Sequence, residues 1–94
     1  MRIELLDAAV ADLGAIDRHI SADSRDAARR VVLHLLERIE QLADQPHRGR
    51  TGRWPHTREL VVSPYIIPYR VKGQTVEVLR VFHGAREWTD QAAA

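Results

Sequence analysis

Apolar residues recur at helical spacing in two stretches of the N-terminal half of the chain. From Ala8 to Ile20 and from Arg25 to Ala43 they return every three or four residues, which is typical of one face of an amphipathic helix. The apolar positions are Ala9, Leu13, Ile16 and Ile20 in the first stretch, and Ala28, Val31, Val32, Leu35, Ile39 and Leu42 in the second. A short polar turn from Ser21 to Ser24 separates them, so the two helices are predicted to form an antiparallel hairpin.

Alternating apolar and polar residues predict strands on both sides of this hairpin. A short strand precedes it from Arg2 to Leu6, and three more follow it, from Thr57 to Ser63, from Tyr65 to Val71 and from Thr75 to His83. The glycine-containing turn Lys72-Gly73-Gln74 stands between two apolar runs and therefore indicates a β-hairpin.

Prolines and glycines mark the interruptions between these elements. Pro46 ends the second helix, and the loop from Pro46 to His56 is too rich in glycine and proline to hold regular structure for long. Pro68 has no N–H to donate to a neighbouring strand, so we expect it at a sheet edge or a bulge. Gly84 ends the last strand, and Ala85 to Ala94 is expected to be a short tail or helical turn.

The predicted order of elements is β-α-α-β-β-β, which defines an α+β fold. A chain of 94 residues forms one domain, here residues 1–94. We expect the helical hairpin to pack on one face of a four-stranded, mostly antiparallel sheet that includes the N-terminal strand. The opposite face of that sheet is then left open for function.

Composition excludes several kinds of chemistry. The chain has no cysteine, which rules out disulfides, thiolate metal sites and thiol nucleophiles. No apolar run approaches the roughly 20 residues of a membrane span, and the start of the chain does not read as a signal peptide. We therefore expect a cytoplasmic protein that has no membrane partner.

The distribution of charge points to an anionic partner. The formal net charge is only +1, but all basic residues except Lys72 are arginine, and arginines outnumber acids from Arg48 to Arg86. The planar guanidinium can grip phosphate or carboxylate in two places at once. Some of these arginines can instead pair across strands with Glu59, Glu77 or Glu87, and such exposed pairs contribute little to stability.

Five segments together resemble a known family. They are Asp12-Leu13 with its helical stripe, Pro46-His47-Arg48-Gly49-Arg50, Arg58 to Val62, Tyr65 to Val71, and Val78 to Trp88. In this order and spacing they are similar to the RelE/ParE toxins over nearly the whole chain. The resemblance implies the toxin of a type II toxin–antitoxin module. It also implies a cognate antitoxin, a small protein whose disordered segment folds around the toxin.

The family divides by target, and one branch consists of nucleases. RelE-like members resemble enzymes that cleave messenger RNA on the ribosome, which needs an acid, a base and cations for the phosphate. The candidates for that chemistry are His83, Arg80 and Arg86, with Glu59 as a second possible base. RelE-like nucleases usually carry an arginine early in the third strand, at the place held here by Ile66.

The other branch binds DNA gyrase and needs an arginine-bearing surface but no acid–base pair. The ending from His83 to Trp88 looks more like this ParE type, which we favour. The candidate target-binding residues are Arg58, Arg70, Arg80, Arg86 and Trp54. A third hypothesis is a non-toxic module that only binds its antitoxin, and growth arrest on expression would distinguish it from the other two.

No cofactor or metal is expected in any of these hypotheses. The remaining histidines are His19, His34, His47 and His56, and no pair of them has the helical spacing of a zinc site. We interpret these four side chains as solvated surface. Trp54 either stacks on a nucleic-acid base or covers the edge of the small core.

Overall fold

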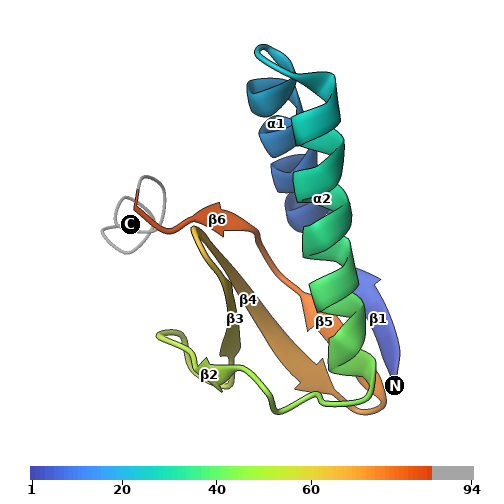
Figure 1. The fold of residues 1–94 in the computed structure, drawn as a ribbon. Coiled ribbons are helices and arrows are strands. Elements are labelled where there is room, and N and C mark those ends of the chain that lie inside the picture. The colour runs from blue at the N-terminus through green and yellow to red at the C-terminus, as the bar shows by residue number, and fades with distance from the viewer. Residues whose placement is uncertain (86–94) are drawn as a thin grey trace.

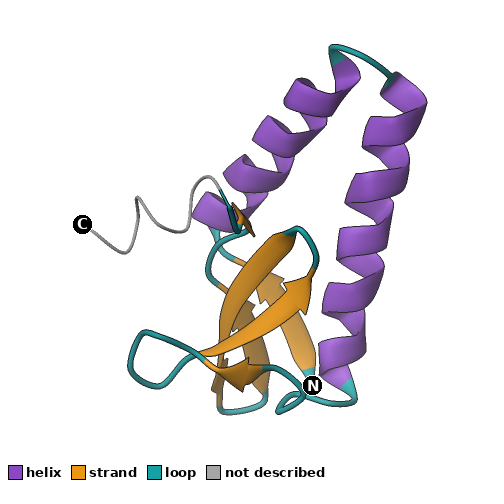
Figure 2. Cartoon of the chain, turned by 60° about the vertical axis from the view of Figure 1, so that its left-hand side comes forward, coloured by secondary structure: helices purple, strands orange, loops and turns teal. Residues whose placement is uncertain are grey.

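The computed structural model describes residues 1–85 of the 94-residue chain, and the α+β prediction is confirmed. Two helices and a sheet form two layers (Figures 1 and 2). The elements are β1 (Arg2–Leu5), α1 (Asp7–Ser21), α2 (Arg25–Glu40), the 3₁₀ turn η1 (Gln41–Ala43), β2 (Arg50–Thr51), β3 (Arg58–Val62), β4 (Tyr65–Lys72), β5 (Thr75–Val78) and β6 (Phe82–His83).

The helical hairpin forms as its apolar spacing predicts. The backbone N–H of Ala27 donates to Ser24 Oγ over 3.1 Å, so Ser24 caps α2 and ends the turn. The two helices extend beyond the strands, and the turn between them lies far from the sheet (Figure 1). Only the lower part of the hairpin therefore covers the strands.

The sheet has the order β1-β5-β4-β3-β2, and β6 also pairs with β4. β1 runs parallel to β5, with Ile3 opposite Val76, and the other pairs are antiparallel. The sheet thus has six strands where four were predicted. The loop after α2 contributes the two-residue strand β2, and the predicted strand from Thr75 to His83 is divided into β5 and β6.

Pro68 explains why that last strand is divided. Its carbonyl accepts the Leu79 N–H over 2.9 Å, so this residue directs its backbone groups toward the chain that joins β5 to β6. A residue with an N–H here would continue the ladder, but proline has none to donate. The ladder therefore breaks beside Pro68, and pairing with β4 resumes only at Phe82, opposite Ile66. Pro68 thus lies in a central strand and not at a sheet edge, at the place where pairing on one side of β4 is interrupted.

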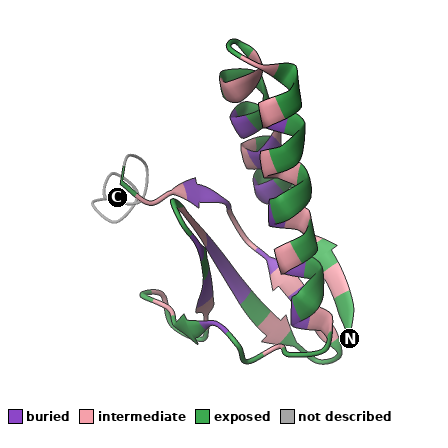
Figure 3. Cartoon of the chain, viewed as in Figure 1, coloured by how far each residue is buried: buried purple, intermediate pink, exposed green. Residues whose placement is uncertain are grey.

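The core lies between the hairpin and one face of the sheet (Figure 3). Side chains alternate along each strand, so Leu60 and Val62 of β3 face the helices together with Ile67 and Tyr69 of β4. The fully or nearly fully buried core residues also include Ala9, Leu13, Ile16, Leu35, Ile39, Leu42, Val76, Val78 and Val81.

The reverse face of the sheet is not as open as predicted. Ile66 and Phe82 alternate with core residues and so project from this side, where the edge of the Phe82 ring meets Trp54 at a centroid distance of 6.2 Å. Phe82 is completely buried. The loop that carries Trp54 therefore covers part of the face on which we expected an exposed arginine surface.

Neither helix in residues 1–85 is long and apolar enough to cross a membrane. Over the same residues, no group of three or more histidine and carboxylate side chains is arranged to hold a metal ion.

Candidate functional site

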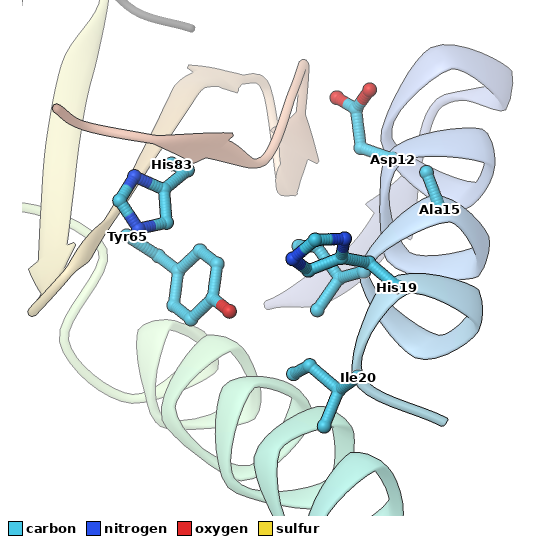
Figure 4. Close-up of a pocket in the computed structure, with 7 residues that line it drawn as sticks. Asp12, Ala15, His19, Ile20, Tyr65 and His83 are labelled. Atoms are coloured by element: carbon cyan, nitrogen blue, oxygen red, sulfur yellow. The ribbon is translucent and has the colours of Figure 1, made fainter. Parts of the chain in front are cut away.

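A pocket of about 240 Å³ opens between α1 and the strands β4 and β6 (Figure 4). It brings together Asp12, Ala15, Ile16, His19 and Ile20 of α1 with Tyr65 and His83. His83 lies opposite Tyr65 in the sheet, and their rings meet edge to face at 5.7 Å. His19 points into the same space from the helix (Figure 4).

Of the residues that line this pocket, only His83 was predicted as a site residue. His19 is exposed, as expected for a surface histidine, but it borders the pocket that contains His83. Tyr65 was predicted only as the first residue of a strand. The signal that could have found His19 is its seven-residue separation from Asp12, which places both side chains on one face of α1.

Arg80 is close to His83 in sequence, but its guanidinium binds Asp12. Its Nε and Nη2 donate to the two carboxylate oxygens of Asp12 over 2.7 and 3.0 Å, and its guanidinium lies 4.6 Å from the centre of the Phe82 ring. The same carboxylate accepts the Val81 N–H over 2.9 Å. Arg80 therefore has a carboxylate partner on α1, which cross-strand pairing did not suggest.

Arg58 holds the loop that follows α2. Its Nη1 donates to the carbonyl oxygens of His47 and Gly49 over 3.2 and 2.9 Å. The Tyr69 hydroxyl supports the same loop, since it accepts the Gly49 N–H over 2.9 Å and donates to the Pro46 carbonyl over 2.8 Å. Burial raises the pKa of Tyr69 above its usual value, against the smaller lowering effects of the Gly49 N–H and Arg58.

Arg70 lies on the reverse face and pairs across strands with Glu77 over 2.6 Å. Arg58 and Arg70 also border one shallow hollow of about 400 Å³, together with His47 and His56. This hollow thus brings two of the predicted target-binding arginines together, and Glu77 neutralises one of them, Arg70.

Glu59 is the one buried charged residue of the described chain, with 4% of its surface exposed. One of its oxygens accepts from Arg50 Nε and the other from the Arg53 N–H, each over 3.0 Å. Both oxygens therefore hold the loop that carries Trp54 in place. That engagement leaves Glu59 poorly suited to act as a base.

The predictions for Arg86 and Glu87 fall on residues outside the described part of the chain. The structure therefore places Arg58, Arg70 and Arg80 in three separate networks, and brings His83 to a pocket with Tyr65 and His19. What these networks can do chemically is position loops and bind anions or a protein surface.

The fold and these positions define a small toxin of the RelE/ParE superfamily. The family model for the ParE toxin of the type II toxin–antitoxin system parDE matches residues 3–88, so the chain belongs to this family. The implied class, a toxin of a type II module, is confirmed.

Two relatives agree with this assignment. The Y4kP protein of Sinorhizobium fredii is 45% identical over 78 residues, which span 81% of this chain and 80% of the relative. Toxin RelE2 of Caulobacter vibrioides is 40% identical over 78 residues, which span 83% of this chain and 89% of the relative. The first of these relatives is named after neither branch, and the second is named after the RelE branch.

Solved structures give the same fold. The chromosomal ParDE system from P. aeruginosa contains a chain with a TM-score of 0.78 and 28% identity, and the match covers 88% of this chain and 95% of that one. The RelBE2 toxin–antitoxin complex from Mycobacterium tuberculosis has a TM-score of 0.68 at 23% identity, over 87% and 95% of the two chains. Both neighbours come from toxin–antitoxin systems.

Proposed function

We propose that this toxin arrests growth by binding and inhibiting DNA gyrase, without hydrolytic chemistry of its own. The single observation that carries the proposal is which residues occupy the reverse face of the sheet. Ile66 stands where RelE-like nucleases carry an arginine, and beside it lies the buried Phe82. The one carboxylate projecting there from β3, Glu59, has both oxygens occupied by hydrogen bonds to its own loop.

Cleavage of RNA requires groups that can move a proton and cations that can meet the developing charge. Within residues 1–85, Arg80 is committed to Asp12, and Arg58 is committed to two backbone carbonyls. A toxin that acts by binding needs only a fixed surface, and these networks provide one. The match of the chain to the ParE family model supports the same choice.

The second candidate is a ribosome-dependent nuclease, and one observation favours it. His83, Tyr65 and His19 line one pocket, so two imidazoles and a phenol could share acid–base work there. In that case the cations would have to come from Arg80 or from Arg86.

Induced expression in a bacterial host tests both candidates. We expect filamentation with an SOS response, and we expect the purified toxin to inhibit supercoiling of relaxed plasmid by gyrase. Messenger RNA cut within codons on ribosomes, with normal supercoiling by gyrase, would instead select the nuclease. A host that grows normally while the protein accumulates in folded form would contradict both and select the antitoxin-binding module.

A further inference from the structure

The shallow hollow beside Arg58 and Arg70 is built almost entirely from hydrogen-bond donors. Among residues 1–85, its lining combines two arginines, two histidines and two threonines with one apolar residue, and it includes no carboxylate. These lining residues are His47, Thr51, His56, Thr57, Arg58, Arg70 and Val71. Side chains of this kind bind anionic oxygen atoms, and arginine can bind a phosphate through two parallel N–H groups. The composition of the hollow therefore favours a ligand that carries phosphate.

Arg58 is anchored in this hollow by uncharged groups. Its Nη1 alone donates to the His47 and Gly49 carbonyl oxygens, over 3.2 and 2.9 Å. Within the described chain, the Nε and Nη2 groups of Arg58 form no hydrogen bond or ion pair. The guanidinium is thus held in one position, keeps its positive charge uncompensated, and still has N–H groups for an anion.

Two further cations stand on the reverse face of β4 next to the hollow. Arg70 is 44% exposed, and it pairs with Glu77 through Nε, so the terminal N–H groups of its guanidinium point to no printed partner in residues 1–85. Lys72 follows two residues later on the same face, roughly 7 Å along the strand. It is exposed and forms no hydrogen bond or ion pair with the described residues. Since Glu77 neutralises Arg70, the excess positive charge comes from Arg58 and Lys72.

This surface is separate from the pocket that contains His83. Tyr65 and His83 pair at the first residue of β4, whereas Arg70 and Lys72 lie toward its other end. The hollow is completed by β2 and the loops on either side of it, at the edge of the sheet opposite β1 (Figures 1 and 2). The hollow therefore has no part in the acid–base pocket of the second candidate function.

We infer that this hollow, with Lys72 beside it, binds the phosphodiester backbone of duplex DNA. A duplex carries one negative charge for about every 1.7 Å of its axis, so it offers phosphates to Arg58 and Lys72 at the same time. Such contacts read no base, so binding is independent of sequence. The inference deepens the proposed function and rests on it for its role in the cell, where gyrase holds DNA beside the bound toxin.

A protein surface and an unpaired strand are poorer occupants. Protein interfaces have an apolar core, whereas Val71 is the one apolar residue among residues 1–85 that lines this hollow. Interfaces with DNA are more polar and more positively charged. An unpaired strand gains affinity by stacking its bases on aromatic rings, and no phenylalanine, tyrosine or tryptophan of the described chain lines the hollow. The lining therefore favours a duplex backbone.

The test titrates ¹⁵N-labelled full-length toxin with a short duplex DNA of arbitrary sequence at low salt. We expect the duplex to shift the Arg58 Nε–H resonance and the amide resonances of Gly49 and Val71. Because two phosphates are neutralised, the logarithm of the binding constant should fall against the logarithm of salt concentration with a slope of about −2. Absence of binding, a slope near zero, or shifts confined to another face would overturn the inference.

Three other probes test the choice of ligand. A single strand of RNA with the same number of phosphates, and a blocked glutamate peptide of the same charge, should each bind about fivefold more weakly than the duplex. Equal binding of the RNA would select an unpaired strand, and equal binding of the peptide would select an acidic protein, so either result overturns the inference. The same holds if inorganic phosphate, at an equal concentration of phosphate groups, shifts the same resonances equally.

Matched variants separate the local site from the net charge of the toxin. Lys72→Gln removes one exposed charge at the end of β4, so the fold should survive while the salt slope becomes less steep by about 1. Arg29→Gln removes one exposed charge of α2 that does not line the hollow, and it should leave the slope unchanged. Arg58→Lys keeps the charge but loses the planar fork, so it should weaken binding about fivefold. Parental binding by both Lys72→Gln and folded Arg58→Lys would refute the site, and the Lys72 and Arg29 pair decides alone if Arg58→Lys does not fold.

DNA binding and gyrase inhibition are measured separately, so the inference and the proposed function can fail independently. If the toxin binds the duplex through Arg58 and Lys72 but does not inhibit gyrase, the proposed function fails and the DNA site stands. If the toxin inhibits supercoiling but does not bind the duplex, the inference fails and the proposed function stands. When both hold, Lys72→Gln should inhibit supercoiling less than Arg29→Gln does at the same concentration.

Discussion

Asp12 and Arg80 are 68 residues apart in sequence and form a two-pronged ion pair, with Nε to Oδ2 over 2.7 Å and Nη2 to Oδ1 over 3.0 Å. Asp12 lies on α1, and Arg80 lies in the break between β5 and β6. The Val81 N–H also donates to Asp12, so one carboxylate fixes the irregular chain that leads to His83. The helical hairpin and the end of the sheet are thereby held in one geometry.

Loss of this carboxylate should destabilise the fold. We expect Asp12→Ala to lower the free energy of unfolding by about 2 kcal/mol, because it removes three hydrogen bonds to a charged group and leaves Arg80 and the Val81 N–H without that partner. Urea denaturation should show a lower midpoint with an unchanged slope. Asp17→Ala is the matched control, since Asp17 is exposed on the same helix and accepts only one long bond from Ser21. A midpoint for Asp12→Ala equal to that of the control would contradict the role given to Asp12.

The Tyr69 hydroxyl should also contribute to stability, through the loop after α2. Tyr69→Phe leaves the buried Gly49 N–H without its acceptor and the Pro46 carbonyl without a donor, so we expect a loss of about 2 kcal/mol in the free energy of unfolding. The Gly49 amide should exchange faster with solvent in this variant. Tyr65→Phe is the control, because the Tyr65 hydroxyl forms no hydrogen bond within residues 1–85. Equal stabilities of the two variants would show that the loop does not depend on Tyr69.

Burial of Tyr69 predicts a specific dependence on pH. Since the chain has two tyrosines, Tyr65→Phe leaves Tyr69 alone, and its ultraviolet titration should have a midpoint above 10.0 in the folded protein. A pKa raised in the folded state means that the folded protein holds the proton more tightly. The stability that Tyr69 contributes is therefore present below pH 10 and is lost as the pH rises through the folded pKa. The same variant in concentrated urea should titrate at a lower pH, and coincident titrations would contradict the prediction.

The regular elements were predictable because their cause is local. The stripe from Ala9 to Ile20 and the stripe from Ala28 to Leu42 each define a buried helix face, and Pro68 signals an interrupted ladder. The split of the last strand was missed because strand-forming residues recur from Val76 to Phe82 and no proline or glycine interrupts them. The interruption comes from the neighbouring strand β4, in which Pro68 has no N–H to donate to the chain between β5 and β6.

The site was less predictable, because its contacts join distant parts of the chain. The alternation of residues along the predicted strand places Arg80 on its surface. No feature of the neighbouring sequence indicates that Arg80 pairs with Asp12 of α1. Glu59 similarly looks like an exposed strand residue, but the loop from Arg50 to Thr57 folds back and buries it. Long-range ion pairs of this kind depend on the tertiary fold, which spacing does not encode.

His83 gives the sharpest separation between the two proposed activities. If the toxin acts by binding gyrase, His83→Ala should leave growth arrest largely intact, because the imidazole packs against Tyr65 in a pocket instead of serving as an acid or base. If the toxin cleaves RNA with His83, loss of proton transfer should lower activity by about 10² to 10⁴-fold. Growth after induction is the measurement, and His34→Ala is the control because His34 is exposed on α2 and does not line this pocket. Complete loss of toxicity in folded His83→Ala, with the control still toxic, would reverse the ranking and select the nuclease.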